Sequence, residues 1–334
     1  MVVIQISGET RPRRARHANC QKQNGRREAD GHAASGRTII ANNERLLSSC
    51  FPGRGSTCRA VVEVRVRIVS SVAAWASVPC VSAPSVSPLS GRAAVVTGAS
   101  SGLGQATAER LAADGAAVAL LARRADDLMS TQTRITQLRG SAIALPMDLA
   151  DAAAIEAAVA RVVAEWGRID VLVNAAATDV PGPVEALDQH DWDRVVAVNL
   201  TAPFLLAKAV WPHLRRAGGG TIINVSSVAG RRGWANAAAY CATKFALTGL
   251  TQSLAAEGRP HGIRACVLYP GAMATAWGIW DSTQRDSALG PDRTPNEALP
   301  ANQVADLIAW IAAAPANLVL NEATVTPLLE QGWP

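Results

Sequence analysis

The sequence predicts a single α/β domain in which a doubly wound, mostly parallel sheet of about seven strands is flanked by helices. Three observations favour this fold class. Short apolar runs of strand length alternate with longer segments of helical composition from residue 92 onward. A glycine-rich turn joins the first of these strands to the first helix, and polar side chains follow the ends of several strands. Ligands of such sheets bind at the carboxyl ends of the strands, so we expect the functional residues to gather there.

The apolar runs and helical segments can be placed in order along the chain. The expected strands cover residues 92–96, 117–121, 142–146, 169–173, 221–225, 263–268 and 318–320. The expected helices cover residues 105–113, 125–138, 152–166, 190–214 with a bend near Pro203, about 237–256, and 304–314. Alternation of this kind is typical of strand–helix–strand units, because a parallel strand can be reached only by a crossover connection.

The first ninety residues differ in composition from the rest of the chain. They hold 13 Lys and Arg against 5 Asp and Glu, which leaves 19 against 22 for residues 91–334. The net charge of +5 therefore belongs to this N-terminal segment, and the body has no basic excess that would indicate nucleic acid binding. We expect residues 1–90 to form a disordered extension and residues 91–334 to form the domain, because the extension lacks the apolar periodicity that a core needs.

Three interpretations of the N-terminal segment stay open. Its arginine-rich, acid-poor composition resembles a transit peptide. The segment could instead be an arm that binds an anionic partner. Translation could also start downstream, at a valine or leucine codon, for example that of Val78 or Val86, since no methionine lies between Met1 and Met129. We favour the last of the three.

Cysteine usage and hydropathy narrow the class of protein further. Only Cys241 and Cys266 lie in the body, and the sequence has no Cys/His spacing of a zinc site. We therefore expect no metal, no disulfide framework, and a cytoplasmic location, with organelle targeting by residues 1–90 as the alternative. No run of 18 or more uncharged apolar residues predicts a membrane span.

The turn after the first strand has the composition of a dinucleotide-binding loop. Residues 97–104 read T-G-A-S-S-G-L-G. Glycines in such a turn let the backbone approach a pyrophosphate, and the N-terminus of the next helix offers free N–H groups and a positive dipole. A plain β-turn can also be glycine-rich, but the order strand, turn, helix favours a nucleotide site.

The end of the second strand indicates which dinucleotide is bound. An acidic residue there would accept a hydrogen bond from the ribose 2′-hydroxyl of NAD, whereas an arginine suits the 2′-phosphate of NADP. The sequence has Ala122 followed by Arg123 and Arg124. This favours NADP(H), while NAD(H) stays possible if the two arginines are only solvated charges at the start of the next helix.

A tyrosine and a lysine four residues apart indicate acid–base chemistry. Tyr240 and Lys244 fall in a predicted helix, where positions i and i+4 share a face. An ammonium group near a phenol lowers the pKa of the tyrosine from about 10, which would make Tyr240 a general acid/base near neutral pH. Ser227 follows the fifth strand and could hydrogen-bond a carbonyl that the tyrosine protonates. The pair taken alone is equally compatible with chance spacing on an amphipathic helix.

Together and in this order, the motifs resemble those of the short-chain dehydrogenase/reductase family, whose domain has a Rossmann-type fold. The resemblance covers residues 91–334 and rests on T-G-x-x-x-G-x-G at 97–104, Asp148, Asn174, Asn199, Ser227, Y-x-x-x-K at Tyr240 and Lys244, and Pro270-Gly271. It implies an NADP-preferring oxidoreductase that interconverts carbonyl compounds and alcohols by hydride transfer. A dinucleotide-binding regulator that has lost catalysis is the alternative.

The resemblance implies a role for each matching residue. Tyr240 would be the general acid/base, Lys244 would lower its pKa and hold the nicotinamide ribose, Ser227 would position the substrate oxygen, and Asn199 would anchor a water. Asp148 would accept from the adenine amino group, and Asn174 would steady the middle of the sheet. The implied cofactor contacts are Gly98, Ser100, Ser101, Gly102, Leu103, Gly104, Arg123, Asp148, Leu149, Asn174, Ala175, Tyr240, Lys244, Pro270, Gly271 and Thr275.

The sequence departs from the family pattern at two places. The usual N-N-A-G after the fourth strand reads N-A-A-A here, and the usual V-D-G-G turn near the C-terminus is missing.

Trp277, Ile279 and Trp280 would lie on a lid over an apolar or ring-bearing substrate, and Arg231 could meet a substrate carboxylate. Packing residues and solvated loop charges are the alternative interpretation. The expected partners are a small alcohol or carbonyl compound and further copies of the chain, in a homo-tetramer or dimer.

Overall fold

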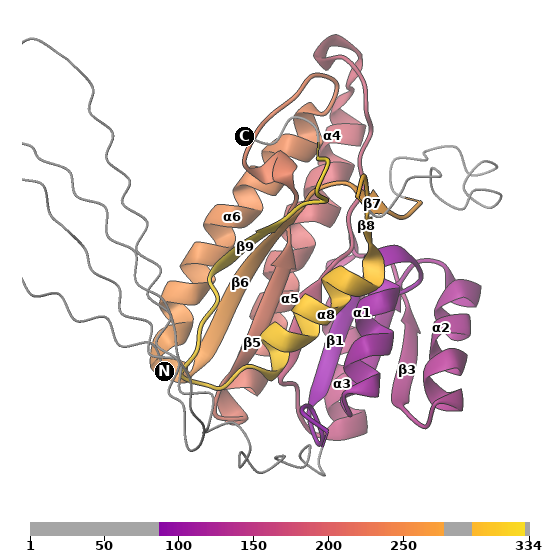
Figure 1. The fold of residues 1–334 in the computed structure, drawn as a ribbon, viewed down its shortest axis with the longest axis vertical. Coiled ribbons are helices and arrows are strands. Elements are labelled where there is room, and N and C mark those ends of the chain that lie inside the picture. The colour runs from indigo at the N-terminus through magenta and orange to yellow at the C-terminus, as the bar shows by residue number, and fades with distance from the viewer. Residues whose placement is uncertain (1–86, 277–295, 331–334) are drawn as a thin grey trace, which may run out of the picture. The chain divides into compact units, whose positions relative to one another are not determined.

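The computed structural model describes residues 87–276 and 296–330, and it has the predicted α/β architecture. Seven parallel strands form one sheet in the order β3-β2-β1-β4-β5-β6-β9 (Figure 1). The strands are β1 (Ala93–Thr97), β2 (Ala117–Ala122), β3 (Ser141–Pro146), β4 (Val171–Asn174), β5 (Gly220–Val225), β6 (Ile263–Pro270) and β9 (Glu322–Val325). The strand order reverses between β1 and β4, which is where doubly wound sheets bind their ligands.

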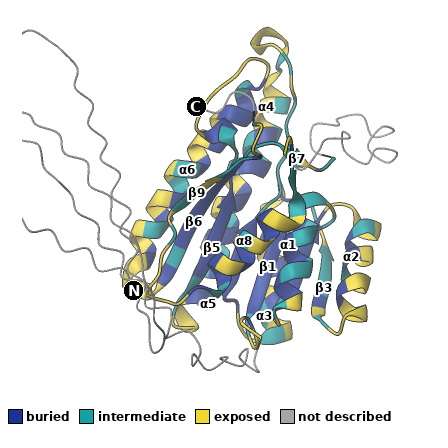
Figure 2. Cartoon of the chain, viewed as in Figure 1, coloured by how far each residue is buried: buried dark blue, intermediate teal, exposed yellow. Residues whose placement is uncertain are grey.

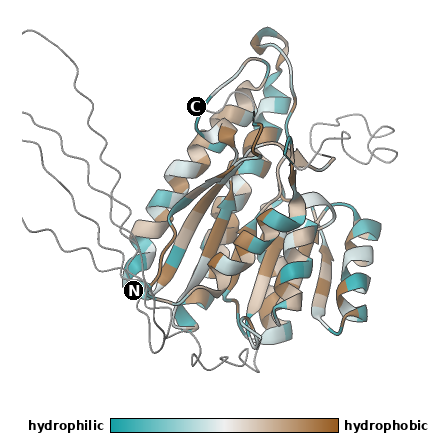
Figure 3. Cartoon of the chain, in the orientation of Figure 1, coloured by the Kyte–Doolittle hydropathy of each residue, from teal (hydrophilic) through white to brown (hydrophobic). Residues whose placement is uncertain are grey.

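Helices cover both faces of this sheet. They are α1 (Gly102–Ala113), α2 (Ala125–Gln137), α3 (Ala152–Trp166), α4 (Gln189–Val196), α5 (Ala202–Arg216), α6 (Ala238–Gly258) and α8 (Ala301–Ala313). One apolar cluster joins α1, α2 and α8 to one face, and a second joins α3, α5 and α6 to the other. Figure 2 shows the central strands buried and the outer sides of the helices exposed, and Figure 3 shows the same strands as hydrophobic. Strands covered on both faces read as continuous apolar runs, which is why the sequence revealed them.

The packed domain begins slightly before the predicted boundary at residue 91. Leu89 is fully buried in the cluster formed with α1, α2 and α8. Its backbone N–H donates to the carbonyl of Asp114 at 2.9 Å, which fastens it to the turn between α1 and β2. Leu89 is therefore part of the core.

The prediction for the last strand is wrong. Residues 318–320 form no strand, and β9 lies at Glu322–Val325, where it pairs with the end of β6. The Arg264 guanidinium donates from Nη1 to the backbone carbonyls of Pro315 at 2.9 Å and Leu318 at 3.0 Å, so these carbonyls face the side chain instead of a neighbouring strand. The apolar run that suggested a strand is a loop held by one arginine.

The helix predicted for residues 190–214 is divided into α4 and α5 by a π-helical turn, η3 (Ala197–Thr201). Pro203 follows in the first turn of α5. Proline has no N–H to donate and disfavours helical backbone at the preceding residue, so the irregularity lies just before it. The helix thus changes its hydrogen-bond pattern just before Pro203, where a bend was expected, and this π turn contains the buried Asn199. Such π turns occur frequently at functional sites.

By length and composition alone, the helical run Gln189–Arg216 is apolar enough to cross a membrane. Of the apolar 18-residue stretch within this run, 44% is buried inside the protein. Leu206, Val210 and Leu214 are fully buried in the cluster between the sheet, α3 and α6. A core helix of a globular protein can be equally long and apolar. Packing against the sheet therefore accounts for the composition of Gln189–Arg216.

Candidate active site

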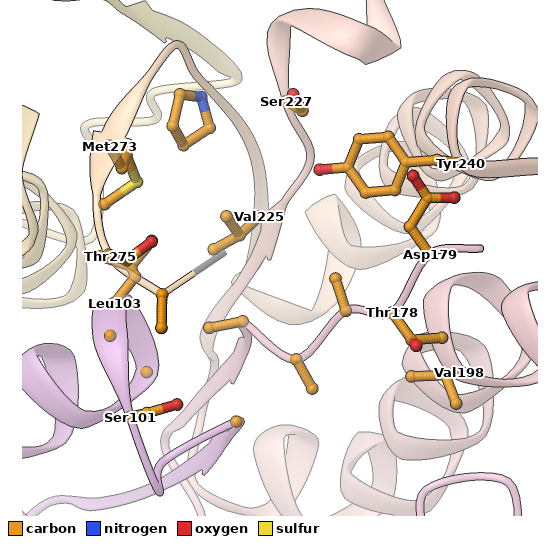
Figure 4. Close-up of a pocket in the computed structure, with 18 of the residues that line it drawn as sticks. Ser101, Leu103, Thr178, Asp179, Val198, Val225, Ser227, Tyr240, Met273 and Thr275 are labelled. Atoms are coloured by element: carbon orange, nitrogen blue, oxygen red, sulfur yellow. The ribbon is translucent and has the colours of Figure 1, made fainter. Parts of the chain in front are cut away.

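A cavity of about 1230 Å³ lies at the carboxyl ends of the strands (Figure 4). Ligand pockets for drug-sized molecules measure roughly 300–1,000 Å³, so this cavity has room for a dinucleotide and a small second molecule. Most of the residues predicted to form the site line it. They are Gly98, Ser100, Ser101, Gly102, Leu103, Gly104, Arg123, Asp148, Leu149, Ala175, Ser227, Tyr240, Lys244, Pro270, Gly271 and Thr275.

The glycine-rich turn between β1 and α1 fits a dinucleotide. A Cβ on Gly104 would lie 2.3 Å from the carbonyl oxygen of Gly98, so no larger residue can occupy this position. Gly98 has a φ of +70°, which favours glycine. The Ser101 side chain does not cap the N-terminus of α1, and the first residues of this helix line the cavity. A helix N-terminus without a cap has free N–H groups that can bind a pyrophosphate.

At the end of β2, one of the two predicted arginines is already engaged. Arg124 forms an ion pair with Asp127, with Nε 2.6 Å from Oδ2. Arg123 is exposed, lines the cavity, and forms no ion pair with any residue that the structure describes. Of the two, Arg123 is therefore the one available for a 2′-phosphate.

Asp148 lines the same end of the cavity and is held by a partner that the sequence did not indicate. Burial acts to raise the pKa of Asp148, but hydrogen bonds from Arg194 and from the Ala150 N–H hold that pKa below its usual value. The Arg194 Nη1 to Asp148 Oδ2 distance is 2.9 Å. Arg194 comes from α4 and meets Asp148 only through the fold, so no local pattern could reveal it.

Tyr240 and Ser227 face each other across the inner end of the cavity. In Figure 4 the Tyr240 hydroxyl points toward Ser227, and a hydrogen bond from Ser227 acts to lower the pKa of the phenol. Ser227 Oγ also accepts from the Ala229 N–H at 3.1 Å. The neighbouring Ser226 donates instead to the Lys244 carbonyl at 3.0 Å. Of the two serines, Ser227 is thus the one that lies beside the phenol.

The protonation of Tyr240 and Lys244 differs from the prediction. Burial raises the pKa of Tyr240 above its usual value, and this outweighs the hydrogen bond from Ser227. Burial also lowers the pKa of Lys244 to about 7. Lys244 Nζ donates to the Val225 carbonyl at 2.9 Å and lies 5.5 Å from the centroid of the Tyr240 ring. In the protein without ligands, burial therefore sets the direction of the Tyr240 pKa shift, and the lowering of that pKa by Lys244 stays a prediction for the reacting complex.

Asn199 is buried behind the cavity and does not line it. Its Oδ1 accepts from the Thr178 N–H at 2.8 Å, and its Nδ2 donates to the Thr178 carbonyl at 2.8 Å and to Thr243 Oγ1 at 3.2 Å. Thr243 Oγ1 in turn donates to the Tyr240 carbonyl at 2.9 Å. Both the oxygen and the nitrogen of the side-chain amide are engaged in these contacts, and the anchoring of a water by Asn199 stays a prediction.

Asn174 also lies outside the cavity, so the prediction that it contacts the cofactor is not supported. Its Nδ2 donates to Asn224 Oδ1 at 2.8 Å, and Asn224 Nδ2 donates to Thr251 Oγ1 at 2.8 Å. These buried bonds connect β4 to β5 and to α6. Asn174 therefore steadies the middle of the sheet, as the resemblance implied.

Only some of the residues expected to contact the substrate belong to the part of the chain that the structure describes. Arg231 pairs with Glu322, and its guanidinium carbon lies 4.2 Å from the centroid of the Tyr269 ring. Arg231 does not line the cavity, which favours the packing interpretation, and its contact with a substrate carboxylate stays a prediction. Trp234, from the same loop, does line the cavity. Trp277, Ile279 and Trp280 lie outside the described residues.

Four charged residues line the cavity without having been singled out in the sequence: Asp127, Asp179, Arg194 and Glu330. Glu330 Oε2 accepts from the Ala272 N–H at 2.9 Å beside the Pro270-Gly271 turn. Asp179 follows β4 by five residues, and an acidic residue after a strand end is a signal that could have found it. Glu330 follows β9 by the same interval, but the sequence placed the last strand at residues 318–320 and so hid this signal, whereas Arg194 lies within α4.

Nicotinamide-dependent oxidoreductases with a Rossmann-type sheet are the class of protein that this fold and cavity define. Residues 92–285 match the family model for short chain dehydrogenases, and the chain belongs to that family. It is therefore an NAD(P)-dependent oxidoreductase acting between alcohols and carbonyl compounds, and none of these findings favours an inactive regulator.

The chain is similar over most of its length to characterised relatives. A D-threitol dehydrogenase from Mycolicibacterium smegmatis is 36% identical over 233 residues, which are 69% of this chain and 89% of that protein. The short-chain reductase protein NovJ from Streptomyces niveus is 39% identical over 242 residues, which are 69% of this chain and 90% of that protein. A crystal structure of a metagenomic short-chain oxidoreductase in complex with NADP has a TM-score of 0.63 and 36% identity, covering 73% of this chain and 100% of that one.

The buried Lys244 predicts a pH dependence of stability. Its pKa is about 7 in the folded protein and about 10.4 in an unfolded chain. Between these values the unfolded state binds a proton that the folded state does not, so the stability of the wild type rises with pH. Lys244→Met removes this dependence. We expect the stability of K244M relative to the wild type, measured by urea unfolding, to be greater at about pH 7 than at about pH 9.

The exposed Lys208 on α5 provides the matched control. We expect K208M to differ from the wild type by the same free energy of unfolding at both pH values. A difference between K244M and the wild type that does not change with pH would show that Lys244 is charged in both states.

Proposed function

We propose that the protein is an NADP-preferring alcohol dehydrogenase or carbonyl reductase in which Tyr240 exchanges a proton with the substrate oxygen. The observation that carries this proposal is the placement of the Tyr240 hydroxyl against Ser227, inside a cavity that also contains Lys244 and the glycine-rich turn (Figure 4). A proton donor, a hydrogen-bonding hydroxyl and a dinucleotide-shaped turn in one cavity are what carbonyl reduction requires.

The chemistry divides between the cofactor and the side chains. The nicotinamide, when bound, supplies or accepts the hydride. Ser227 orients the substrate oxygen by a hydrogen bond, and Tyr240 gives that oxygen a proton in reduction or takes one in oxidation. Burial keeps Tyr240 protonated before reaction, so the phenol is in the form that a carbonyl substrate needs.

Lys244 stabilises the charge that forms when Tyr240 loses its proton. With a pKa of about 7, Lys244 is present in both protonation states near neutral pH. A negative phenolate favours the ammonium form of a lysine 5.5 Å from its ring. The ammonium form of Lys244 therefore stabilises the Tyr240 phenolate, and formation of the phenolate raises the fraction of Lys244 that is charged.

The preference for NADP rests on Arg123. Of the two arginines after β2, Arg124 is paired with Asp127, whereas Arg123 forms no ion pair with a described residue and lines the cavity. Ala122 has no carboxylate that could accept a hydrogen bond from a ribose hydroxyl. The related metagenomic oxidoreductase was solved in complex with NADP, which supports the same choice. Asp148 and Leu149 line the cavity beside Arg123 and would hold the adenine.

We also propose that the chain assembles through α5 and α6. Phe204 on α5 and Phe245 on α6 are 47% and 46% exposed, and association through these helices would remove their apolar surface from water. A homo-tetramer or dimer and a cytoplasmic location both stay predictions.

Removal of the Tyr240 hydroxyl tests the proton transfer. We expect Tyr240→Phe to lower kcat by about 10²- to 10⁴-fold, the usual contribution of general acid–base catalysis, and to leave NADPH binding unchanged. Tyr269→Phe is the matched control, because this hydroxyl bonds to Thr248 and does not line the cavity. Steady-state turnover and fluorescence titration with NADPH provide the two readouts. Equal turnover in Y240F and Y269F would remove Tyr240 from the mechanism.

Removal of the Arg123 guanidinium tests the cofactor preference. We expect Arg123→Ala to weaken NADPH binding by roughly ten- to hundred-fold, the worth of hydrogen bonds to a charged group, and to leave NADH binding unchanged. Arg161→Ala, on the exposed side of α3, is the control. Fluorescence titration with both cofactors gives the affinities. A wild type that prefers NADH, or an R123A variant that loses both cofactors equally, would contradict the assignment.

A further inference from the structure

Asp179 places a carboxylate beside the reacting groups. It lies on the segment after β4 and lines the cavity together with Thr178 and Tyr240. Figure 4 shows its carboxylate directed toward the ring of Tyr240. Its charge acts to raise the pKa of the Tyr240 phenol, so the carboxylate is close enough to influence the proton that the reaction moves.

The Asp179 carboxylate is half-buried and incompletely bonded. Its Oδ1 accepts from the Val180 N–H at 2.8 Å, while no donor among the described residues reaches Oδ2. Burial raises the pKa of Asp179, and no basic side chain of the described chain opposes this. A partly desolvated oxygen without a donor costs free energy that a hydrogen bond from a ligand would recover.

The backbone around Asp179 is held in place. Both the N–H and the carbonyl of the preceding Thr178 bond to the Asn199 amide. The same amide reaches the Tyr240 carbonyl through Thr243. The carboxylate and the phenol are thus attached to one buried group, which fixes their relative position and makes a two-point contact with a substrate precise.

We propose that Asp179 is a specificity-determining residue that accepts a hydrogen bond from a second hydroxyl of the substrate, close to the carbon that reacts at Tyr240. The inference rests on the proposed function, because it names the substrate class of the same cavity: vicinal diols and polyols. An anionic group would be repelled by the carboxylate. The polyol in the name of the related D-threitol dehydrogenase is a compound of the inferred class.

A hydroxyl fits this position better than an ammonium group. Burial already disfavours a positive charge at this end of the cavity, as the lowered pKa of Lys244 shows. A hydroxyl supplies the missing donor and brings no charge that must be desolvated.

The test compares a diol with the corresponding mono-alcohol. The probes are cis-1,2-cyclohexanediol, cyclohexanol and trans-2-aminocyclohexanol, each oxidised with NADP⁺. The enzymes are the wild type, Asp179→Ala, Asp179→Asn and the control Asp126→Asn, which removes an exposed carboxylate of α2 outside the cavity. The readout is the ratio of kcat/KM for the diol to that for cyclohexanol, because this ratio cancels any effect of Asp179 on Tyr240 or on folding.

We expect the wild type and D126N to prefer the diol over cyclohexanol by roughly ten- to hundred-fold, the worth of a hydrogen bond to a charged group. In D179A the ratio should fall to about one, whereas D179N should keep part of the preference because an amide oxygen still accepts. Equal kcat/KM values for diol and cyclohexanol in the wild type, or a ratio unchanged by D179A, would overturn the inference and leave the proposed function intact.

Two further outcomes are also decisive. A preference for the amino alcohol over the diol that disappears in D179A would overturn the hydroxyl assignment. An NADP⁺-binding wild type that oxidises no secondary alcohol or diol of a broad panel, and reduces none of the matching ketones, would overturn the proposed function itself and the inference with it.

Discussion

One buried amide, that of Asn199, connects the parts of the molecule that form the reaction centre. It lies in the π-helical turn between α4 and α5 and bonds to both polar groups of the Thr178 backbone and to Thr243. A buried amide that lost these partners would be costly, so the loop after β4 and the helix that carries Tyr240 are held together. These contacts of Asn199 hold the segment with Thr178 and the helix with Tyr240, which form two walls of the cavity, at a fixed spacing. The turn that interrupts the helix is thus a functional part of the fold.

Burial governs the chemistry of the two groups at the centre of the cavity. Tyr240 and Lys244 both lie on α6 and are almost completely buried, at 7% and 2% exposure. Desolvation disfavours the charged form of each, which leaves a protonated phenol and a lysine with a pKa of about 7. The phenolate that forms when the proton moves is then stabilised by attraction between the two charges. A low-dielectric site strengthens that charge–charge attraction at the moment when it stabilises the reaction.

The sequence predicted those features that depend on local pattern. Strands such as β1 are buried on both faces and therefore read as apolar runs, and the turn requires glycine at position 104 because a Cβ there would lie 2.3 Å from the Gly98 carbonyl oxygen. Features that arise from tertiary contacts could not be predicted. The loop at 318–320 depends on Arg264, more than 50 residues away in the chain. The raised pKa of Tyr240 depends on burial, which spacing on a helix does not reveal.

The central claim is that hydrogen passes directly between a substrate carbon and the nicotinamide while Tyr240 exchanges only a proton. The most direct measurement is the oxidation of a secondary alcohol that carries deuterium at the reacting carbon, followed by mass spectrometry of the isolated cofactor. The account predicts that the deuterium is found in the NADPH and that single-turnover oxidation shows a primary isotope effect. Deuterium lost to water, or ketone formed without reduced cofactor, would contradict it.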